Sequence, residues 1–299
     1  MKEGLNVKKT NMLKETSGVE NGESGQYEYL SERSPEFNEA LQGIDLDLMR
    51  RLLQEEAEKC GREKGGSLNF LDTARIGETE TRAKDDSIPI SFYDSSTNEI
   101  QVDFTGMEQQ AERQNPFLSK DGFRAYLVAV LTHEQIHATT ELQTLGYVGY
   151  QHFNSYQVWN EGVTEKLARE LTEKYFKSSA NFKKIDQAKS YNYESAVLLI
   201  DAVIAKISAQ TGFDQETVWG AIKKGMFENT NLETKELQEL FDGTLPLDFF
   251  KKLRTMSTAN EAEIHELIEH LNQGTIQKIV ERLVKFLHLE KPSSSQKAA

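Results

Sequence analysis

The stretch L-T-H-E-Q-I-H-A at residues 131–138 constrains this chain more than any other. On a helix, His133 and His137 stand four residues apart, so their imidazoles project from one face about one turn apart. The preceding residues, 123–131, are mostly apolar. A helix with so much apolar surface is expected to be buried, and the stretch therefore predicts a rigid helix in the middle of the fold.

The same spacing favours a metal site, because two neutral imidazole nitrogens one turn apart can bind a single zinc ion. Glu134 lies beside them and is suited to take a proton from zinc-bound water. A similar stretch, H-E-L-I-E-H at 265–270, has its histidines five residues apart. On a helix they would point about 140° away from each other, so we interpret His265 and His270 as helix surface.

Charge and hydropathy narrow the class of protein. The 299 residues carry a formal net charge of −13, with 37% hydrophobic and 28% charged residues and a mean hydropathy of −0.60. Nucleic acid and anionic membranes bind basic surfaces, so we expect neither as a partner. The sequence has no apolar run of about 18 residues and no apolar signal core at its start. We expect a cytoplasmic protein, with signal-less export left open.

Cys60 is the only cysteine. An internal disulfide and a cluster of thiolate zinc ligands are therefore excluded. The neighbours of Cys60 are mainly Glu, Lys and Gly, with no histidine nearby, so we do not expect it to act as a nucleophile.

The first 58 residues contain a polar segment followed by a helical pattern. Residues 1 to about 40 are polar and rich in Gly, Ser and Glu, which predicts a mobile leader. Leucines at helical spacing within residues 41–58 predict a helix that Asp45 or Asp47 could cap.

The clearest strand signal follows. Alternating runs at 88–93 and 100–104 predict a β-hairpin, and Pro89 places its first strand at the edge of a sheet. Such an edge could pair with an extended peptide, or the hairpin could simply cover the core.

Polar residues and glycines mark both ends of the central helix. Pro116, then Ser119 or Asp121, indicate where it begins. An aromatic, glycine-containing segment at residues 146–156 follows it. This segment could form a wall or lid over the metal, or its rings could pack on the core.

From residue 158 onward the chain is almost entirely helical in pattern. Apolar residues recur every four positions from Trp159 to Leu171, and residues 196–207 are strongly apolar. Asp214 starts another helix after Gly212. Further helices are predicted at 247–253, 262–271 and 276–289.

A zinc ion needs at least three protein ligands, and the first of these later helices offers more. Within W-N-E-G-V-T-E-K, Glu161 and Glu165 are again four residues apart, so both carboxylates face the same way. One can bind the metal while the other accepts a hydrogen bond from a ligand imidazole and fixes its tautomer. Carboxylates at this spacing are common on solvated helix faces, and it is the upstream histidine motif that favours the metal site.

The two motifs together, H-E-Q-I-H at 133–137 and N-E-G-V-T-E at 160–165, resemble the signature of the gluzincins. This group contains the thermolysin-like and aminopeptidase-like zinc metallopeptidases. The resemblance spans roughly residues 88–175. It implies one Zn²⁺ ion bound by His133, His137 and Glu161, with Glu134 as general base and Glu165 as the carboxylate that orients an imidazole.

The chain also departs from the family pattern. The interval between His137 and Glu161 is a few residues longer than in the best-known members, so the aromatic segment reads as an insertion. The metzincin pattern is absent, because residues 139–149 contain no histidine and His152 lies too far on. The aminopeptidase motif, G-x-M-E-N-like, is not visible, which favours an endopeptidase.

The resemblance implies hydrolysis of a peptide bond in a peptide or protein substrate. Zincins usually add a tyrosine or histidine that donates a hydrogen bond to the tetrahedral oxyanion. Tyr193 and Tyr191, at the head of an apolar helix, are the preferred candidates, and His152 and Tyr150 come next. Anchoring a helix or loop is the commoner use of such side chains.

We therefore expect an α+β, mostly helical, zincin-like fold, in which a hairpin or small sheet packs on the motif helix and an all-helical subdomain follows. The expected divisions are residues 1–40, 41–141, 142–290 and 291–299. The expected function is that of a zinc metallopeptidase. A non-catalytic zinc-binding protein that regulates or binds another protein is the alternative, and a helical interaction protein with a chance motif stays open. The oligomeric state is not predicted.

Overall fold

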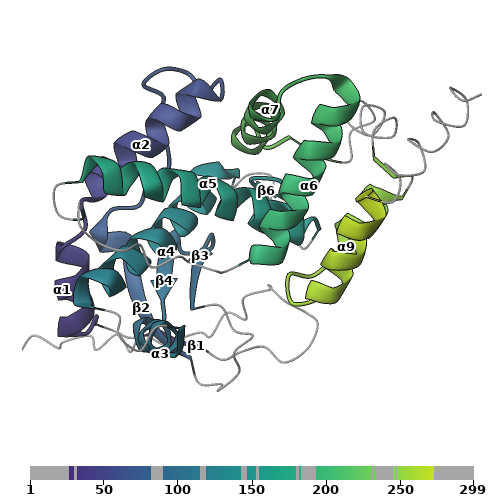
Figure 1. Ribbon diagram of the computed structural model, residues 1–299. Helices are drawn as coiled ribbons and strands as arrows, with labels where there is room; N and C mark the ends of the chain where they lie inside the picture. Colours follow the sequence, from purple (N-terminus) through teal and green to yellow (C-terminus); the bar gives the residue numbers. More distant parts are fainter. Residues whose placement is uncertain are drawn as a thin grey trace, which may run out of the picture.

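Helices make up most of the described part of the molecule, together with two small sheets (Figure 1). The α+β, mostly helical class predicted from the sequence is therefore confirmed. The computed structural model describes residues 27–29, 32–81, 90–114, 119–142, 147–152, 155–179, 182, 193–230, 232, 245–246 and 248–272.

Polar caps set where several helices begin. The side chains of Ser34, Asp45, Ser119 and Asp214 each accept a hydrogen bond from a backbone N–H three residues later. Of the predicted alternatives, the structure thus has Asp45 and not Asp47, and Ser119 and not Asp121, as the caps, and it confirms the start at Asp214. The helices are α1 (Pro35–Gln42), α2 (Leu46–Lys59), the short 3₁₀ helix η1 (Thr73–Arg75), α3 (Phe104–Gln114), α4 (Lys120–Thr140), α5 (Gln157–Ser178), α6 (Glu194–Thr211), α7 (Gln215–Phe227) and α9 (Phe249–Thr255).

The strands form two sheets. The first has the order β1-β2-β4-β3, in which β2 and β4 are parallel and the two outer pairs are antiparallel. The second is a short antiparallel sheet of order β5-β6-β7. The strands are β1 (Tyr27–Tyr29), β2 (Ile76–Thr81), β3 (Ser91–Asp94), β4 (Glu99–Val102), β5 (Glu141–Leu142), β6 (Tyr147–Val148) and β7 (Gln151–His152).

The predicted hairpin is confirmed, with shifted ends. β3 and β4 pair antiparallel over their whole length, and their turn contains Asn98 in the left-handed region, with φ 55°. Among the described strands, β3 is one of the two edge strands of its sheet, as predicted. Phe104, expected in the second strand, instead begins α3, because the Asp103 carboxylate accepts a hydrogen bond from the Gly106 N–H and caps the helix. Pro89 lies outside the described residues.

The predicted leader extends too far at its C-terminal end, and this boundary is wrong. β1 pairs with β2, and α1 follows with Phe37 fully buried. Ser34 donates hydrogen bonds to the Glu78 carboxylate through both its N–H and its hydroxyl group. Phe37 and Ser34 lie in a stretch that is mostly polar, so its composition does not predict that they are part of the fold. Residues 1–26 lie outside the described part of the chain.

The motif helix α4 is the most enclosed element of the described fold. It packs against β3, β4 and α5, and every residue from 131 to 140 is buried. The burial predicted from the apolar residues 123–131 is therefore confirmed, and it extends over the polar motif as well. A helix held on several sides in this way is a rigid support for a site.

Two clusters of buried apolar side chains meet at α4 and α5. One is filled by α1, the first sheet, α3 and α4, and the other by α5, α6, α7 and α9. Helix α2 contributes to both, with Met49 in the first and Leu53 in the second. The predicted division near residue 141 stays a prediction.

Gly162 allows α5 and α6 to approach each other closely. A Cβ atom at this position would lie 2.7 Å from the Ala196 carbonyl oxygen and 2.9 Å from Ile200 Cγ1. Only glycine fits between the two helices at that distance. The contact brings the head of α6 to the part of α5 that carries the predicted carboxylates.

The helical second half largely follows the predicted pattern. The residues from Trp159 to Leu171 that recur every four positions are buried, and α6 ends at Gly212, whose φ is 81°. α9 overlaps the predicted helix at 247–253, and residues 261–272 are helical. The helix predicted at 276–289 and the tail at 291–299 lie outside the described residues.

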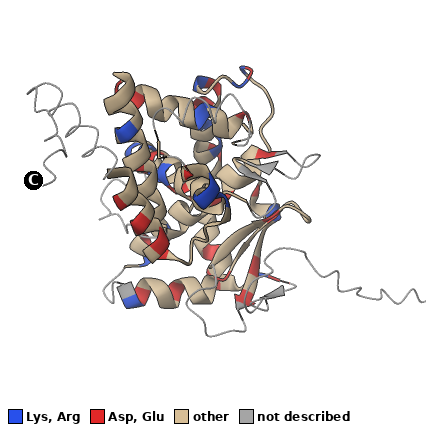
Figure 2. Ribbon diagram, turned by 90° about the vertical axis from the view of Figure 1, so that its right-hand side faces the viewer, with Lys and Arg blue, Asp and Glu red and all other residues tan. Residues whose placement is uncertain are grey.

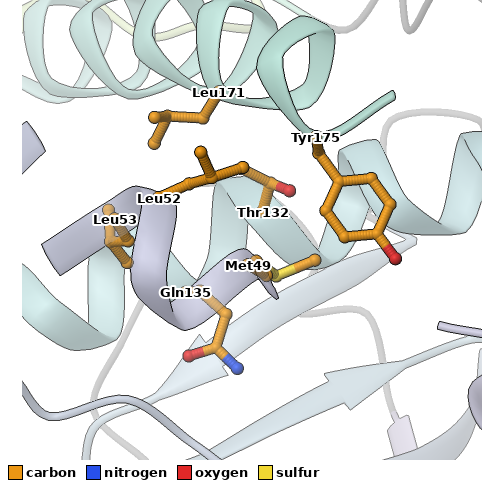
Figure 3. Close-up of a pocket in the computed structure, with 7 residues that line it drawn as sticks. All are labelled: Met49, Leu52, Leu53, Thr132, Gln135, Leu171 and Tyr175. Carbon is orange, nitrogen blue, oxygen red and sulfur yellow. The ribbon is translucent and has the colours of Figure 1, made fainter. Parts of the chain in front are cut away.

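A small hollow lies between α2, α4 and α5 (Figure 3). Thr132 and Gln135 line it from α4, on the face away from the two histidines. Gln135 exchanges hydrogen bonds with the backbone of Leu71, donating at 2.7 Å and accepting at 2.9 Å. This hollow thus belongs to the packing of α4, and the histidine face lies elsewhere. Its lining residues are Met49, Leu52, Leu53, Thr132, Gln135, Leu171 and Tyr175.

Basic positions are scattered among acidic ones along the described helices (Figure 2). Among those helices, none combines the length and the apolar composition that crossing a membrane requires.

Candidate metal centre

The two motif histidines lie where helical spacing puts them. The rings of His133 and His137 have centroids 4.8 Å apart, and their Nε2 atoms are 3.1 Å apart. The side chains are buried, at 6% and 8% exposure. Two ring nitrogens this close, and shielded from water, need a shared proton or a shared cation between them.

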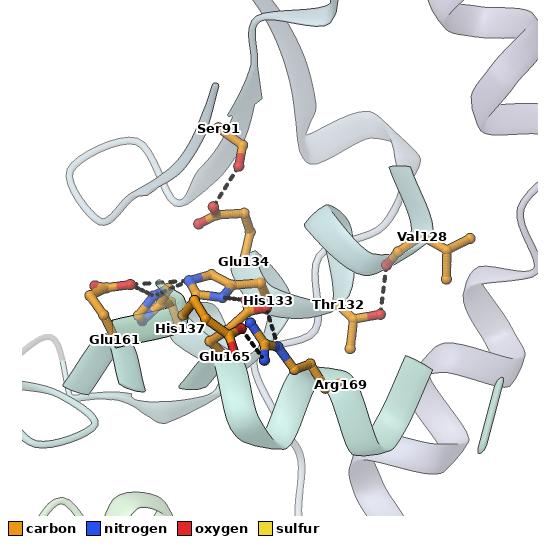
Figure 4. Close-up of polar contacts among 10 residues, drawn as sticks. Ser91, Val128, Thr132, His133, Glu134, His137, Glu161, Glu165 and Arg169 are labelled. Carbon is orange, nitrogen blue, oxygen red and sulfur yellow. Dashed lines mark hydrogen bonds and ion pairs between the residues drawn. The ribbon is translucent and has the colours of Figure 1, made fainter. Parts of the chain in front are cut away.

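Helix α5 supplies a carboxylate at the same point. Glu161 Oε2 lies 3.1 Å from His133 Nε2 and 3.3 Å from His137 Nε2 (Figure 4). The ligand atoms of the three residues all lie within 4.8 Å of one another. This buried group could hold a metal ion.

Electrostatics within the group favour positive charge between the histidines. Burial by itself would raise the pKa of Glu161, but the neighbouring His137 and His133 outweigh it and hold that pKa well below its usual range. Burial would likewise lower the pKa of His133, whereas hydrogen bonds with Glu161 and Glu165 raise it well above the usual value. The carboxylates therefore stabilise a cation at this point, whether a proton or a metal ion.

Glu165, one turn after Glu161, holds the other side of His133. Its Oε2 lies 3.0 Å from His133 Nδ1 (Figure 4). If Nδ1 donates its hydrogen to Glu165, Nε2 keeps its lone pair toward Glu161, which is the tautomer that a metal ligand requires. The equivalent atom of His137, Nδ1, is buried without a hydrogen-bond partner among the described residues.

Behind Glu165 lies an ion pair that we did not predict. Glu165 Oε1 accepts a hydrogen bond from Arg169 Nε at 2.9 Å, and Arg169 Nη1 lies 2.8 Å from Glu194 Oε2. Arg169 follows Glu165 by four positions on α5, a spacing that brings opposite charges together on a helix face. That spacing was a usable signal in the sequence, whereas Glu194 on α6 gave none.

Glu134, the predicted base, points toward the edge strand (Figure 4). Its Oε1 accepts a hydrogen bond from Ser91 Oγ at 2.7 Å, and the side chain is buried. Tyr93, two residues further along β3 and so on the same face, donates to the Glu141 carboxylate just after α4. Hydrogen bonds thus join β3 to one carboxylate on α4 and to another directly after it. Ser91 was not predicted as a site residue.

Tyr193, the preferred tyrosine, contacts the site. Its ring stacks on the imidazole of His133, with centroids 5.4 Å apart and planes inclined by 16°. It precedes α6 in the left-handed region, with φ 58°, a conformation that non-glycine residues adopt at a cost. Tyr191 lies outside the described residues.

Tyr150 is wrong as a candidate. It is buried in the core, where its hydroxyl donates to the Ile222 carbonyl oxygen on α7, and burial raises its pKa. Tyr156 is buried as well, so these two rings of the aromatic segment pack on the core. The other candidate there, His152, forms part of β7, and its side chain is not among the parts described.

The residues that we did not expect to act as metal ligands or nucleophile lie outside the metal-binding group of His133, His137 and Glu161. His265 and His270 are exposed on the helix at 261–272, as predicted. Cys60 is buried at the end of α2, and burial raises the pKa of its thiol, which disfavours the reactive thiolate.

The chain was compared with models of protein families, with curated proteins and with solved structures, and none of them matches it. The gluzincin resemblance therefore rests on the two motifs.

Proposed function

We propose that this protein is a zinc-dependent metallopeptidase of the gluzincin type, and we favour an endopeptidase. The observation that carries the proposal is the convergence of His133, His137 and Glu161 from two helices on one buried point, with Glu134 beside it.

The donor set favours zinc among the common metals. Two imidazole nitrogens and one carboxylate oxygen are a frequent catalytic zinc set, whereas calcium and magnesium prefer oxygen ligands alone. In a tetrahedral site with bonds of about 2.0–2.1 Å, neighbouring donor atoms are about 3.3 Å apart. The three separations here are 3.1, 3.1 and 3.3 Å. The residues therefore fit the ion.

Each side chain then has a defined task. When bound, zinc would make a coordinated water more acidic and polarise the carbonyl of the substrate. Glu134 would accept a proton from the attacking water and pass it to the leaving amine. Glu165 would keep Nε2 of His133 unprotonated by accepting the hydrogen of Nδ1. Tyr193, which stacks on His133, is the described candidate for donating a hydrogen bond to the oxyanion.

The strand β3 lies beside the proposed base. It carries Ser91, whose hydroxyl contacts Glu134. A substrate that reaches this base would therefore pass next to Ser91.

Metal content and one conservative variant test the proposal. We expect the purified protein to hold one zinc ion per chain and to cleave members of a proteome-derived peptide library. Glu134→Gln should keep the zinc and lose cleavage, because the amide cannot accept the proton. The matched control is His270→Gln, which changes a histidine of the similar but exposed stretch and should affect neither zinc content nor cleavage.

A non-catalytic zinc-binding protein is the second candidate. The observation that favours it is that Glu134 is only 5% exposed and already hydrogen-bonded to Ser91, so a substrate would have to reach a covered base. Wild-type protein that holds zinc but cleaves no peptide of the library would support this candidate. Protein that binds no zinc would refute both and leave the motif as a coincidence.

A further inference from the structure

His133 is held at two places besides its metal-facing nitrogen. Glu165 contacts its Nδ1, and the Tyr193 ring lies against its face. One side chain, Arg169, contacts Glu165 directly and also forms an ion pair with Glu194, the residue that follows Tyr193. We propose that Arg169 is a positioning residue. It holds the Glu165 carboxylate in contact with His133, and it keeps the start of α6, with Tyr193, next to the same imidazole. The inference rests on the proposed function.

The first step concerns the Glu165 carboxylate. Its two oxygens have different partners, His133 through Oε2 and Arg169 through Oε1, at 3.0 and 2.9 Å. The side chain is only 4% exposed, so water cannot readily replace a lost partner. Without Arg169, the buried Glu165 carboxylate would keep one hydrogen-bond partner, His133, among the described residues, and it could rotate about its last bond. His133 would then lose the fixed acceptor that sets its tautomer and ring orientation.

The second step concerns the geometry of Arg169 itself. Its guanidinium uses Nε for Glu165 and Nη1 for Glu194, so a planar fork spans a carboxylate on its own helix and one on α6. Lysine has the charge but a single nitrogen, and cannot hold both carboxylates in this way. The Glu194 side chain is half exposed, so this outer pair adds little stability alone. Its effect is to fix where α6 begins.

The third step connects that helix start to the imidazole. Glu194 is the first residue of α6, and Tyr193 directly before it has a left-handed backbone. A tyrosine in that conformation persists only if its surroundings hold it. The Arg169–Glu194 pair on one side and the ring stack on His133 on the other provide such a hold.

Zinc affinity, measured by competition with a chelator, tests the inference without any need for peptidase activity. Arg169→Met should weaken zinc binding about tenfold, at the lower end of what partners of metal ligands contribute. Arg169→Lys should recover part of the loss at most, and it keeps the test valid if the methionine variant folds poorly. The matched control is Lys177→Met, on the same helix and also four residues after a paired glutamate, Glu173, but exposed and away from the site. It should change the affinity less than about twofold.

A double-mutant cycle tests the path of the effect. If Arg169 acts through Glu165, Arg169→Met should add less than about a twofold loss in a Glu165→Gln background. The inference is overturned if Arg169→Met binds zinc as wild type does, or if its effect is undiminished in that background. In either case the zinc site on which the proposed function rests still stands, since wild type binds zinc. If wild type binds no zinc, both fall together.

Discussion

The close contact of α5 with α6 at Gly162 predicts the effect of a single added methyl group. A Cβ in Gly162→Ala would lie 2.7 Å from the Ala196 carbonyl oxygen, about 0.7 Å inside ordinary contact at 3.4 Å. The opposing atom is backbone, so it cannot turn aside as a side chain could. Overpacking of this kind costs about 1–3 kcal/mol, and the better helix propensity of alanine returns about 1 kcal/mol. We expect a net loss of up to about 2 kcal/mol.

Gly220→Ala is the matched control. Gly220 lies inside α7, and a Cβ there would meet no atom within 4 Å, so only the propensity gain of about 1 kcal/mol applies. The two variants should therefore differ by about 1–3 kcal/mol, which corresponds to a difference in Tm of at least about 2 °C. Urea and thermal unfolding, both with chelator present, measure it. If Gly162→Ala stabilises the protein as much as Gly220→Ala does, the close packing of α5 on α6 is refuted.

Two further predictions concern acid stability and the site tyrosine. Burial would raise the pKa of Glu56, but hydrogen bonds from Lys223 and Lys174 outweigh it and lower that pKa from 4.5 to about 2. The ionised carboxylate therefore stabilises the fold by at most about 3 kcal/mol. This stabilisation is present above pH 4.5 and is lost as the pH falls toward 2. Urea midpoints at pH 6 and pH 3 should differ less in Glu56→Gln than in wild type, and an equal difference would contradict the lowered pKa. Tyr193→Phe should keep zinc affinity through the ring stack but lower kcat about 100-fold if the hydroxyl binds the oxyanion, whereas an unchanged kcat would leave Tyr193 a purely structural contact.

Local spacing in the sequence determined the parts of the site that lie within single elements. The i, i+4 pairs His133/His137 and Glu161/Glu165 lie on α4 and α5 as predicted, and the alternating runs form the hairpin with β3 at an edge. These features depend on the fixed periods of helix and strand, which neighbouring residues alone can express. The same reasoning correctly set aside His265 and His270.

Tertiary packing decided how those elements meet. The His133–Glu161 and Ser91–Glu134 contacts join residues 28 and 43 positions apart, and no local period specifies such pairs. Packing likewise took Tyr150 into the core and brought Tyr193 onto His133, although both tyrosines precede predicted helices. The sequence could supply the chemistry of each side chain, but the direction in which each one points depends on how closely α4, α5 and α6 pack. A glycine at position 162 is what permits that distance.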